Sequence, residues 1–314
     1  MRRLVEAGSA VALVMSPSGR AAISIPPEVA TFNAVSDFTD STLRDTAYFL
    51  VSNANSSLPD VLRAARELRR SKVRVTTSAI VHNYAEKFIN GLATKVFLRM
   101  IDVPIAVEPG LRQMRPDILI PPWLSLEAAP PAIASPIHRT GKVKTFARPD
   151  RSKGLHLLPA IYRRLAEKGY VGEVAVGASL QTQSAYKQQL EIDLSPWKVE
   201  GPRNADWIDA GDIFLVPSIS GEAVCLAAQE AMGRGAYVVS SRLGLLPYMS
   251  SSGTGIRTFA VGDVADAARL TVEALEMDHE LFVRECKRGN EQMRERAGLW
   301  YASVVELMVK LGRS

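Results

Sequence analysis

Short apolar runs and longer amphipathic segments alternate along the whole chain. Runs with the length and composition of buried strands occupy residues 10–15, 46–51, 73–80 and 118–120 in the first part, and 142–147, 171–176, 212–217 and 237–240 in the second. Helical spacing occurs at residues 58–70, 155–168, 180–190 and 224–234, and from 264 to 311 with breaks near Asp278 and Gly298. This alternation predicts an α/β protein with parallel sheets.

A proline-rich stretch interrupts the alternation at residues 121–136. Such a composition favours an extended linker, and 314 residues are more than one core of ordinary size needs. We therefore expect two Rossmann-like domains that face a central cleft, a short one over residues 1–125 and a second one over residues 126–314. The terminal helices of the second domain are expected to pack back across the boundary.

Composition narrows the class of protein. Hydrophobic residues make up 47% and charged residues 23%, which is typical of a soluble globular chain. The net charge of +5 suits an anionic ligand, a nucleic acid or an acidic membrane surface, and it is equally consistent with a basic surface that has no specific partner. The basic helix over residues 58–70 keeps peripheral membrane contact open.

Several features exclude other classes of protein. The two cysteines form no disulfide framework, which favours a reducing, cytoplasmic compartment. The four histidines form no zinc motif, so no built-in metal is expected. No apolar run is long enough to span a bilayer. The first residues resemble a signal peptide, but with Glu6 among them they fit a first strand better.

The strongest chemical signal is the segment 212–241, DIFLVPSISGEAVCLAAQEAMGRGAYVVSS, in which a strand leads through a loop of small residues into a helix. Gly221 permits close backbone approach. The start of the helix, with Ala223, Val224 and Cys225, offers free N–H groups that favour a negative group such as a diphosphate.

Two carboxylates flank this helix start. Glu222 precedes it and Glu230 lies on it; if all the residues between them are helical, the rise is on the order of 12 Å. Such a pair suits hydroxyls at the two ends of an extended ligand. Spacing alone is equally consistent with two solvated carboxylates, but Glu230 stands in an apolar run, where a buried carboxylate needs a partner.

A second signal lies in the loop that follows the strand at 142–147. Ligands of open α/β sheets bind at the carboxyl ends of the strands, and Arg148 and Lys153 stand there. Two cations at this place suit a diphosphate and stabilise its charge as it leaves. Gly177 ends the next strand. Without the first motif, a solvated basic loop is the simpler interpretation of Arg148 and Lys153.

The order Arg-x4-Lys-Gly, then Val-Gly, then Pro-Ser-x3-Glu-x7-Glu-Ala-Met-x-x-Gly resembles the donor-binding domain of retaining glycosyltransferases with the two-Rossmann-domain (GT-B) fold, and among them family four, or group 1. The resemblance covers residues 143–261. It implies that Arg148 and Lys153 contact the donor pyrophosphate, that Glu222 contacts the transferred sugar and that Glu230 holds the ribose hydroxyls. It also places Gly177 near the nucleotide, and it implies a UDP- or GDP-sugar donor, no further cofactor and no metal.

Other positions extend or depart from the resemblance. His82, after the third predicted strand, resembles a histidine that the family places near the transferred sugar, although a lone histidine there is more often a structural hydrogen-bonding residue. Val224 and Cys225 stand where relatives usually have an aromatic residue and a glycine, so the side chain of Cys225 is expected to crowd a backbone that normally approaches the donor. Tyr248 stands where a glutamate is common.

The sequence therefore predicts a glycosyltransferase that moves a sugar from a nucleotide-diphosphate sugar to an acceptor hydroxyl with retention. Residues 1–125 would form the acceptor side. The acceptor is open among a glycan, a lipid-linked molecule and a small molecule; nucleic acid has less support, because no aromatic residues interleave with the basic ones. A non-catalytic relative that binds a nucleotide sugar, and a nucleotide-sugar epimerase on the same fold, are the alternatives.

Overall fold

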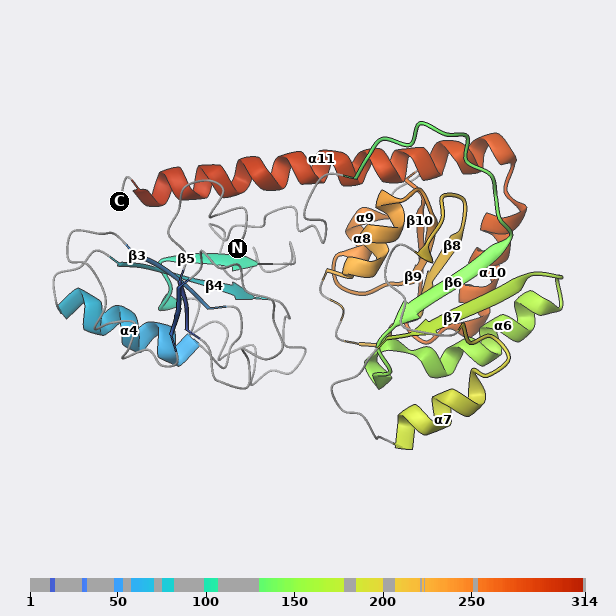
Figure 1. Cartoon of the computed structure of the whole chain (residues 1–314), viewed down its shortest axis with the longest axis horizontal. Coiled ribbons are helices and arrows are strands. Elements are labelled where there is room, and N and C mark those ends of the chain that lie inside the picture. Colours follow the sequence, from blue (N-terminus) through green and yellow to red (C-terminus); the bar gives the residue numbers. More distant parts are fainter. Residues whose placement is uncertain are drawn as a thin grey trace. The chain divides into compact units, whose positions relative to one another are not determined.

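The computed structural model describes residues 12–14, 30–32, 48–52, 58–70, 75–81, 99–106, 130–177, 185–199, 207–220, 222, 224–250 and 254–312. The chain divides into two compact units. The first comprises residues 1–106, 110–119 and 307–314, and the second comprises residues 107–109 and 120–306. Most of their helices and strands are labelled in Figure 1.

The described part of the first unit contains two groups of parallel strands. The larger sheet pairs β3 (Tyr48–Ser52), β4 (Val75–Val81) and β5 (Val103–Ala106) in that order, and α4 (Leu58–Arg70) connects β3 to β4. The smaller pair consists of β1 (Ala12–Val14) and β2 (Ala30–Phe32). The predicted strand at 118–120 lies outside the described residues.

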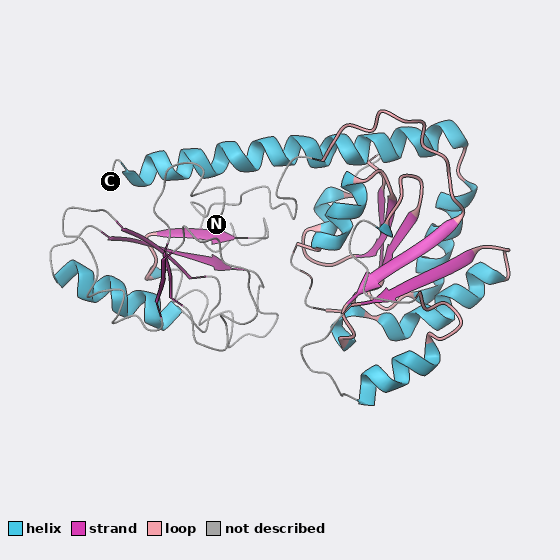
Figure 2. Cartoon of the chain, viewed as in Figure 1, coloured by secondary structure: helices cyan, strands magenta, loops and turns pink. Residues whose placement is uncertain are grey.

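The second unit is built around a five-stranded parallel sheet in the order β10-β9-β8-β6-β7, with helices against it (Figure 2). Its strands are β6 (Lys142–Ala147), β7 (Val171–Val176), β8 (Ile213–Val216), β9 (Tyr237–Ser241) and β10 (Ile256–Phe259). The first four match the predicted strands. The sequence did not predict β10, because this strand of four residues has the polar Arg257 and Thr258 at its centre.

Helices cover both faces of this sheet. They are α6 (Leu158–Ala166), α7 (Ala185–Asp193), α8 (Leu226–Gly233), α9 (Leu246–Met249), α10 (Val264–Glu276) and α11 (His279–Gly312), with the short 3-10 helices η2 (Arg151–Lys153) and η3 (Leu155–Leu157) before α6. Alternate residues of β8 point to opposite faces, as the pleat of a strand requires. Ile213 and Leu215 join one core with α6 and α10, whereas Phe214 and Val216 join another with α8 and α9.

Helix boundaries differ from the prediction in several places: α7 ends at Asp193 rather than at residue 190, for example, and α9 was not predicted. The helix expected from residue 224 begins at Leu226, so Val224 and Cys225 precede it. The break expected at Gly298 is wrong, because α11 continues through this exposed residue. A glycine inside a helix costs only about 1 kcal/mol relative to alanine, which a helix of 34 residues tolerates. The break near Asp278 is confirmed: its side chain accepts a hydrogen bond from Leu281 N at the start of α11.

None of the helices in the described ranges combines the length and the apolar character that crossing a bilayer requires.

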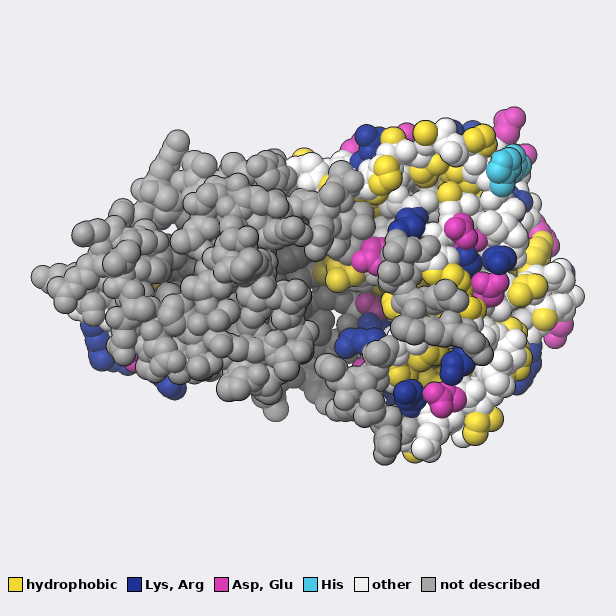
Figure 3. Space-filling model, viewed as in Figure 1, with side chains coloured by type: hydrophobic (Ala, Val, Ile, Leu, Met, Phe, Trp, Pro, Cys, Tyr) yellow, Lys and Arg dark blue, Asp and Glu magenta, His cyan; other side chains and the backbone are white. Residues whose placement is uncertain are grey.

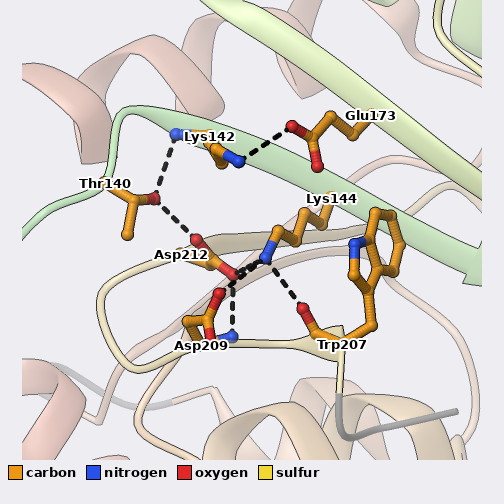
Figure 4. A network of polar contacts seen from close by, with 7 residues as sticks. All are labelled: Thr140, Lys142, Lys144, Glu173, Trp207, Asp209 and Asp212. Carbon is orange, nitrogen blue, oxygen red and sulfur yellow. Dashed lines mark hydrogen bonds and ion pairs between the residues drawn. The ribbon is translucent and has the colours of Figure 1, made fainter. Parts of the chain in front are cut away.

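A buried polar network joins β6 to the residues before β8, at the amino end of the sheet (Figure 4). The side chain of Lys144 is 2% exposed, and its Nζ lies 2.6 Å from Oδ2 of Asp212, which is 0% exposed. Lys144 also donates to Asp209 Oδ2 at 3.0 Å and to the carbonyl oxygen of Trp207 at 2.8 Å. Thr140 Oγ1 donates to the other oxygen of Asp212 at 2.6 Å. The buried charges of Lys144 and Asp212 are therefore paired with each other and hydrogen-bonded, as buried charges must be.

Candidate functional site

The order of the strands in the second unit creates a switch point. The chain passes from β6 to β7 on one side and returns to place β8 on the other side of β6. Open α/β sheets bind ligands outside the carboxyl ends of the two strands at which this order reverses. In this sheet the two strands are β6 and β8, so the loops after Ala147 and Val216 border the candidate site.

The loop after β6 is a structured turn that carries Lys153. The carboxylate of Asp150 accepts a hydrogen bond from Ser152 N at 2.8 Å and caps η2. The hydrogen bonds from Ser152 lower the pKa of Asp150. The turn ends at Gly154, whose φ of 65° lies in the left-handed region that favours glycine. Lys153 is the last residue of η2 and is therefore held at a fixed position on the rim of the site.

The loop after β8 carries Glu222. Its Oε1 lies 2.5 Å from Nζ of Lys153, and the side chains of Lys153 and Glu222 are 17% and 9% exposed. Ser218 Oγ donates to the same oxygen at 2.7 Å. The two residues that the motif assigned to different parts of one ligand thus meet across the switch point. Their interaction is charge-assisted and largely shielded from water, which strengthens it.

Backbone contacts hold the two loops together. Ile219 N donates to the carbonyl oxygen of Ser152 at 2.7 Å, and Ser220 N donates to the same oxygen at 3.3 Å. A Cβ atom placed on Gly154 would lie 1.9 Å from the carbonyl oxygen of Pro217, so only glycine permits this approach. The relative position of Lys153 and Glu222 is therefore fixed by backbone as well as by side chains.

Cys225 has a backbone conformation that is unusual for its type. Its φ is 48°, and no other non-glycine residue in the described part of the chain has a positive φ. The side chain is 6% exposed and packs in the core that lies against α8. Burial raises the pKa of the Cys225 thiol, and the nearby Glu222 carboxylate raises it further. The thiol is therefore a buried, neutral neighbour of Glu222 rather than a reactive group.

The remaining predicted site residues lie on other parts of the second unit or outside the described residues. Arg148 is exposed just after β6, and buried Gly177 follows β7, where its N–H donates to the carbonyl oxygen of Ala147 at 2.9 Å. Glu230 is half-buried on α8. Because the helix begins only at Leu226, the helical rise to Glu230 is about 6 Å, and the 12 Å estimate for a fully helical segment does not apply. His82, Gly221 and Ala223 lie outside the described residues.

Comparison with known proteins identifies this part of the chain. Residues 141–277 match the family model described as "Glycosyl transferases group 1". These residues are a group 1 glycosyltransferase domain. The match contains β6, β8 and α8, and hence both loops of the candidate site. The resemblance that the sequence motif indicated is thereby confirmed at the level of group 1.

Solved structures extend the likeness to nearly the whole chain. Sucrose-phosphate synthase from Thermosynechococcus elongatus has a TM-score of 0.68 at 16% identity, covering 99% of this chain and 90% of that one. The Anabaena protein HepE, in complex with UDP and glucose, has a TM-score of 0.72 at 15% identity, covering 96% and 91%. A glycosyltransferase from Rickettsia africae has a TM-score of 0.75 at 10% identity, covering 98% and 92%. No curated protein sequence matches the chain. These likenesses confirm the predicted α/β class and the GT-B fold around the glycosyltransferase domain.

The roles of Ser218, Asp150 and Ser152 were not predicted from the sequence. Pro217 and Ser218 belong to the recognised motif, but nothing in their spacing predicts a bond from Ser218 to Glu222. The contact depends on which side of the loop faces Lys153 in the folded glycosyltransferase domain. In the described ranges, no three His, Cys, Asp or Glu side chains gather as metal ligands would.

Proposed function

We propose that the chain transfers a sugar from a nucleotide-diphosphate sugar to an acceptor hydroxyl with retention, and that the second unit binds the donor. The observation that carries this proposal is the contact of Lys153 with Glu222 at the switch point of the sheet. A cation suited to a diphosphate and a carboxylate suited to sugar hydroxyls lie side by side. In a nucleotide-diphosphate sugar the sugar is bonded directly to the diphosphate, so groups that bind these two parts are expected to be neighbours.

The chemistry needs charge stabilisation at the diphosphate. As the bond between the anomeric carbon and the diphosphate oxygen breaks, the acceptor oxygen bonds to that carbon, its proton passes to solvent or to the departing diphosphate, and negative charge collects on the leaving group. Lys153 is held largely out of water, where a fixed cation stabilises such charge strongly. Exposed Arg148 and the N–H groups before α8 act from the rim. We propose that these groups suffice without a metal.

The carboxylates would orient the rest of the donor. Glu222 accepts hydrogen bonds from hydroxyls of the transferred sugar, and Glu230 from the ribose hydroxyls, with Gly177 near the nucleotide. His82 is proposed to lie near the transferred sugar, and residues 1–125 to provide the acceptor side.

Local cations rather than the overall charge are proposed to attract the donor. On the face drawn in Figure 3, Lys and Arg side chains of the described residues are interspersed with Asp and Glu. The basic side chains of the described residues therefore form no single broad basic field on that face. Among donors, UDP-sugars come first, since HepE has been solved with UDP and with UDP-glucose; GDP-sugars are the second class.

Ligand-dependent thermal stability tests donor binding. UDP, GDP, UDP-glucose and GDP-mannose are added at millimolar concentration to wild type, to Glu230→Ala and to the control Glu276→Ala, which removes an exposed carboxylate at the end of α10. A ligand at 100 times its Kd stabilises the folded state by about 2.7 kcal/mol. We expect one nucleotide class to stabilise wild type and the control but not Glu230→Ala. If no nucleotide stabilises wild type, the donor site is refuted.

A second measurement separates catalysis from binding alone. Wild type is incubated with the nucleotide sugar that it binds, and release of the nucleoside diphosphate is followed with and without candidate hydroxyl acceptors. Proton NMR of the product then reports the anomeric configuration. Retained configuration is the expected result; binding without release would indicate a non-catalytic relative, and inversion would refute the proposed stereochemistry.

A further inference from the structure

Ser218 lies at the base of the candidate site and has no role in the transfer described so far. It is the second residue after β8 and is 1% exposed. Its hydroxyl donates to Oε1 of Glu222 at 2.7 Å, and Nζ of Lys153 reaches the same oxygen at 2.5 Å. Both donors thus converge on one carboxylate oxygen. The Cys225 thiol is a further hydrogen-bonding neighbour of this carboxylate.

We propose that Ser218 is a positioning residue that fixes the Glu222 carboxylate, so that its second oxygen faces a hydroxyl of the transferred sugar. This inference rests on the proposed function. Glu222 is the group that touches the donor, and Ser218 acts through it.

The ion pair with Lys153 alone cannot fix the direction of the Glu222 carboxylate. A glutamate side chain has several rotatable bonds, and a lysine ammonium can approach its carboxylate from many directions. If a diphosphate attracts Lys153, the carboxylate loses that partner when it has to hold the sugar. A neutral hydroxyl does not respond to the charge of the diphosphate. Ser218 therefore keeps Glu222 oriented whether or not Lys153 stays bonded to it.

The surrounding backbone makes Ser218 suitable for this role. The preceding residue, Pro217, packs its carbonyl group against Gly154, and the following residue, Ile219, donates to Ser152. The serine is therefore fixed on both sides along the chain. Its hydroxyl has a defined direction, and a buried hydrogen bond to a charged group contributes more than one between neutral groups.

The test compares binding of a nucleotide sugar with binding of the nucleotide alone. Isothermal titration measures the Kd of UDP-glucose and of UDP, or of GDP-mannose and GDP if wild type selects guanine, for wild type, Ser218→Ala and Ser218→Cys. Cysteine is close to serine in size but is a weak donor, so it preserves packing if the alanine variant folds poorly. The matched control is Ser240→Ala: Ser240 is a 0% exposed serine and the penultimate residue of neighbouring β9, and its hydroxyl has no partner in the described part of the chain.

Both Ser218 variants are expected to weaken binding of the nucleotide sugar about tenfold, while the Kd of the nucleoside diphosphate stays within about twofold. Ser240→Ala is expected to bind both like wild type. Equal weakening of both ligands, or unchanged binding of the nucleotide sugar, overturns the role of Ser218 while the proposed function stands. If wild type binds neither nucleotide nor nucleotide sugar, the proposed function fails first and the inference fails with it.

Discussion

Replacing Lys144 by methionine tests how strongly the buried network at the amino end of the second sheet contributes to stability. The substitution keeps most of the side-chain volume but removes the charge from a site where Lys144 is 2% and Asp212 0% exposed. Breaking a buried ion pair by removing one partner costs about 3–5 kcal/mol, because the remaining charge is uncompensated. Asp212 still accepts from Thr140 and from the N–H of Asp209. We therefore expect the lower end, about 3 kcal/mol.

Lys142 provides a control on the same strand. Lys142→Met removes an identical charge whose partner, Glu173, lies 3.1 Å away, but the Lys142 side chain is half exposed. Exposed pairs contribute at most about 1 kcal/mol. Urea unfolding followed by tryptophan fluorescence and by circular dichroism gives the free energy for each variant. Equal losses in the two variants would refute the argument that burial decides the magnitude, and so would a loss in Lys144→Met below about 1 kcal/mol.

The pH dependence of the Lys144 contribution provides an independent check. Burial opposes the charged form of Lys144, but its hydrogen bonds and ion pairs with Asp212 and Asp209 outweigh this and raise its pKa above the usual 10.5. The folded state thus holds the proton more tightly than the unfolded chain. The stabilisation is fully present below pH 10.5 and is lost only as the pH rises through the higher folded-state pKa. The stability gap between wild type and Lys144→Met should be constant from pH 7 to 10 and narrow above that range.

Backbone geometry leads to three further predictions, each measured by urea unfolding. Cys225→Gly should be more stable than Cys225→Ala by about 0.5–1 kcal/mol, because both lose the thiol but only glycine accepts the positive φ without strain; the opposite order would contradict the strain. Gly154→Ala should cost about 3 kcal/mol or more, against about 1–2 for Gly141→Ala, since both have positive φ but only the first meets a backbone carbonyl; similar costs would count against that clash. Gly298→Ala should add about 0.5–1 kcal/mol, whereas Gly289→Ala should gain nothing, because its Cβ would lie 3.1 Å from a carbonyl oxygen; equal gains would argue against that close approach.

The sequence was informative where one residue type determines local structure. Four of the strands of the second unit were identified from short runs rich in apolar residues, which are typical of a parallel sheet covered on both faces. Lys153 and Glu222 were selected because each follows such a run, and the structure brings them to 2.5 Å. The weak points were short polar elements such as β10, and the continuation of α11 through Gly298, where a single glycine costs a long helix little.

Contacts between segments that are distant in the sequence could not be predicted from it, for a different reason. Lys144 in a strand has the same sequence signature as an exposed lysine, and only the placement of β8 beside β6 brings Asp212 to it. The bond from Ser218 to Glu222 likewise depends on the loop after β8 closing over the loop after β6. The sequence indicates where each strand ends, but it does not indicate the order of the strands in the sheet. A sequence therefore predicts which loops border a site more readily than it predicts the bonds within that site.

Cys225 shows how a departure from a motif can leave the backbone path intact. The resemblance predicted that its side chain would crowd a backbone that approaches the donor. In the structure the residue adopts the left-handed conformation that glycine favours, and the side chain lies in the core beside α8. An L-residue in this conformation costs about 1–2 kcal/mol, so the surrounding packing must hold it there. The chain thus retains the turn that leads into the helix start, with a strained residue beside Glu222. Strain of this kind persists where neighbouring structure over-determines the backbone, as the paired loops of the candidate site do.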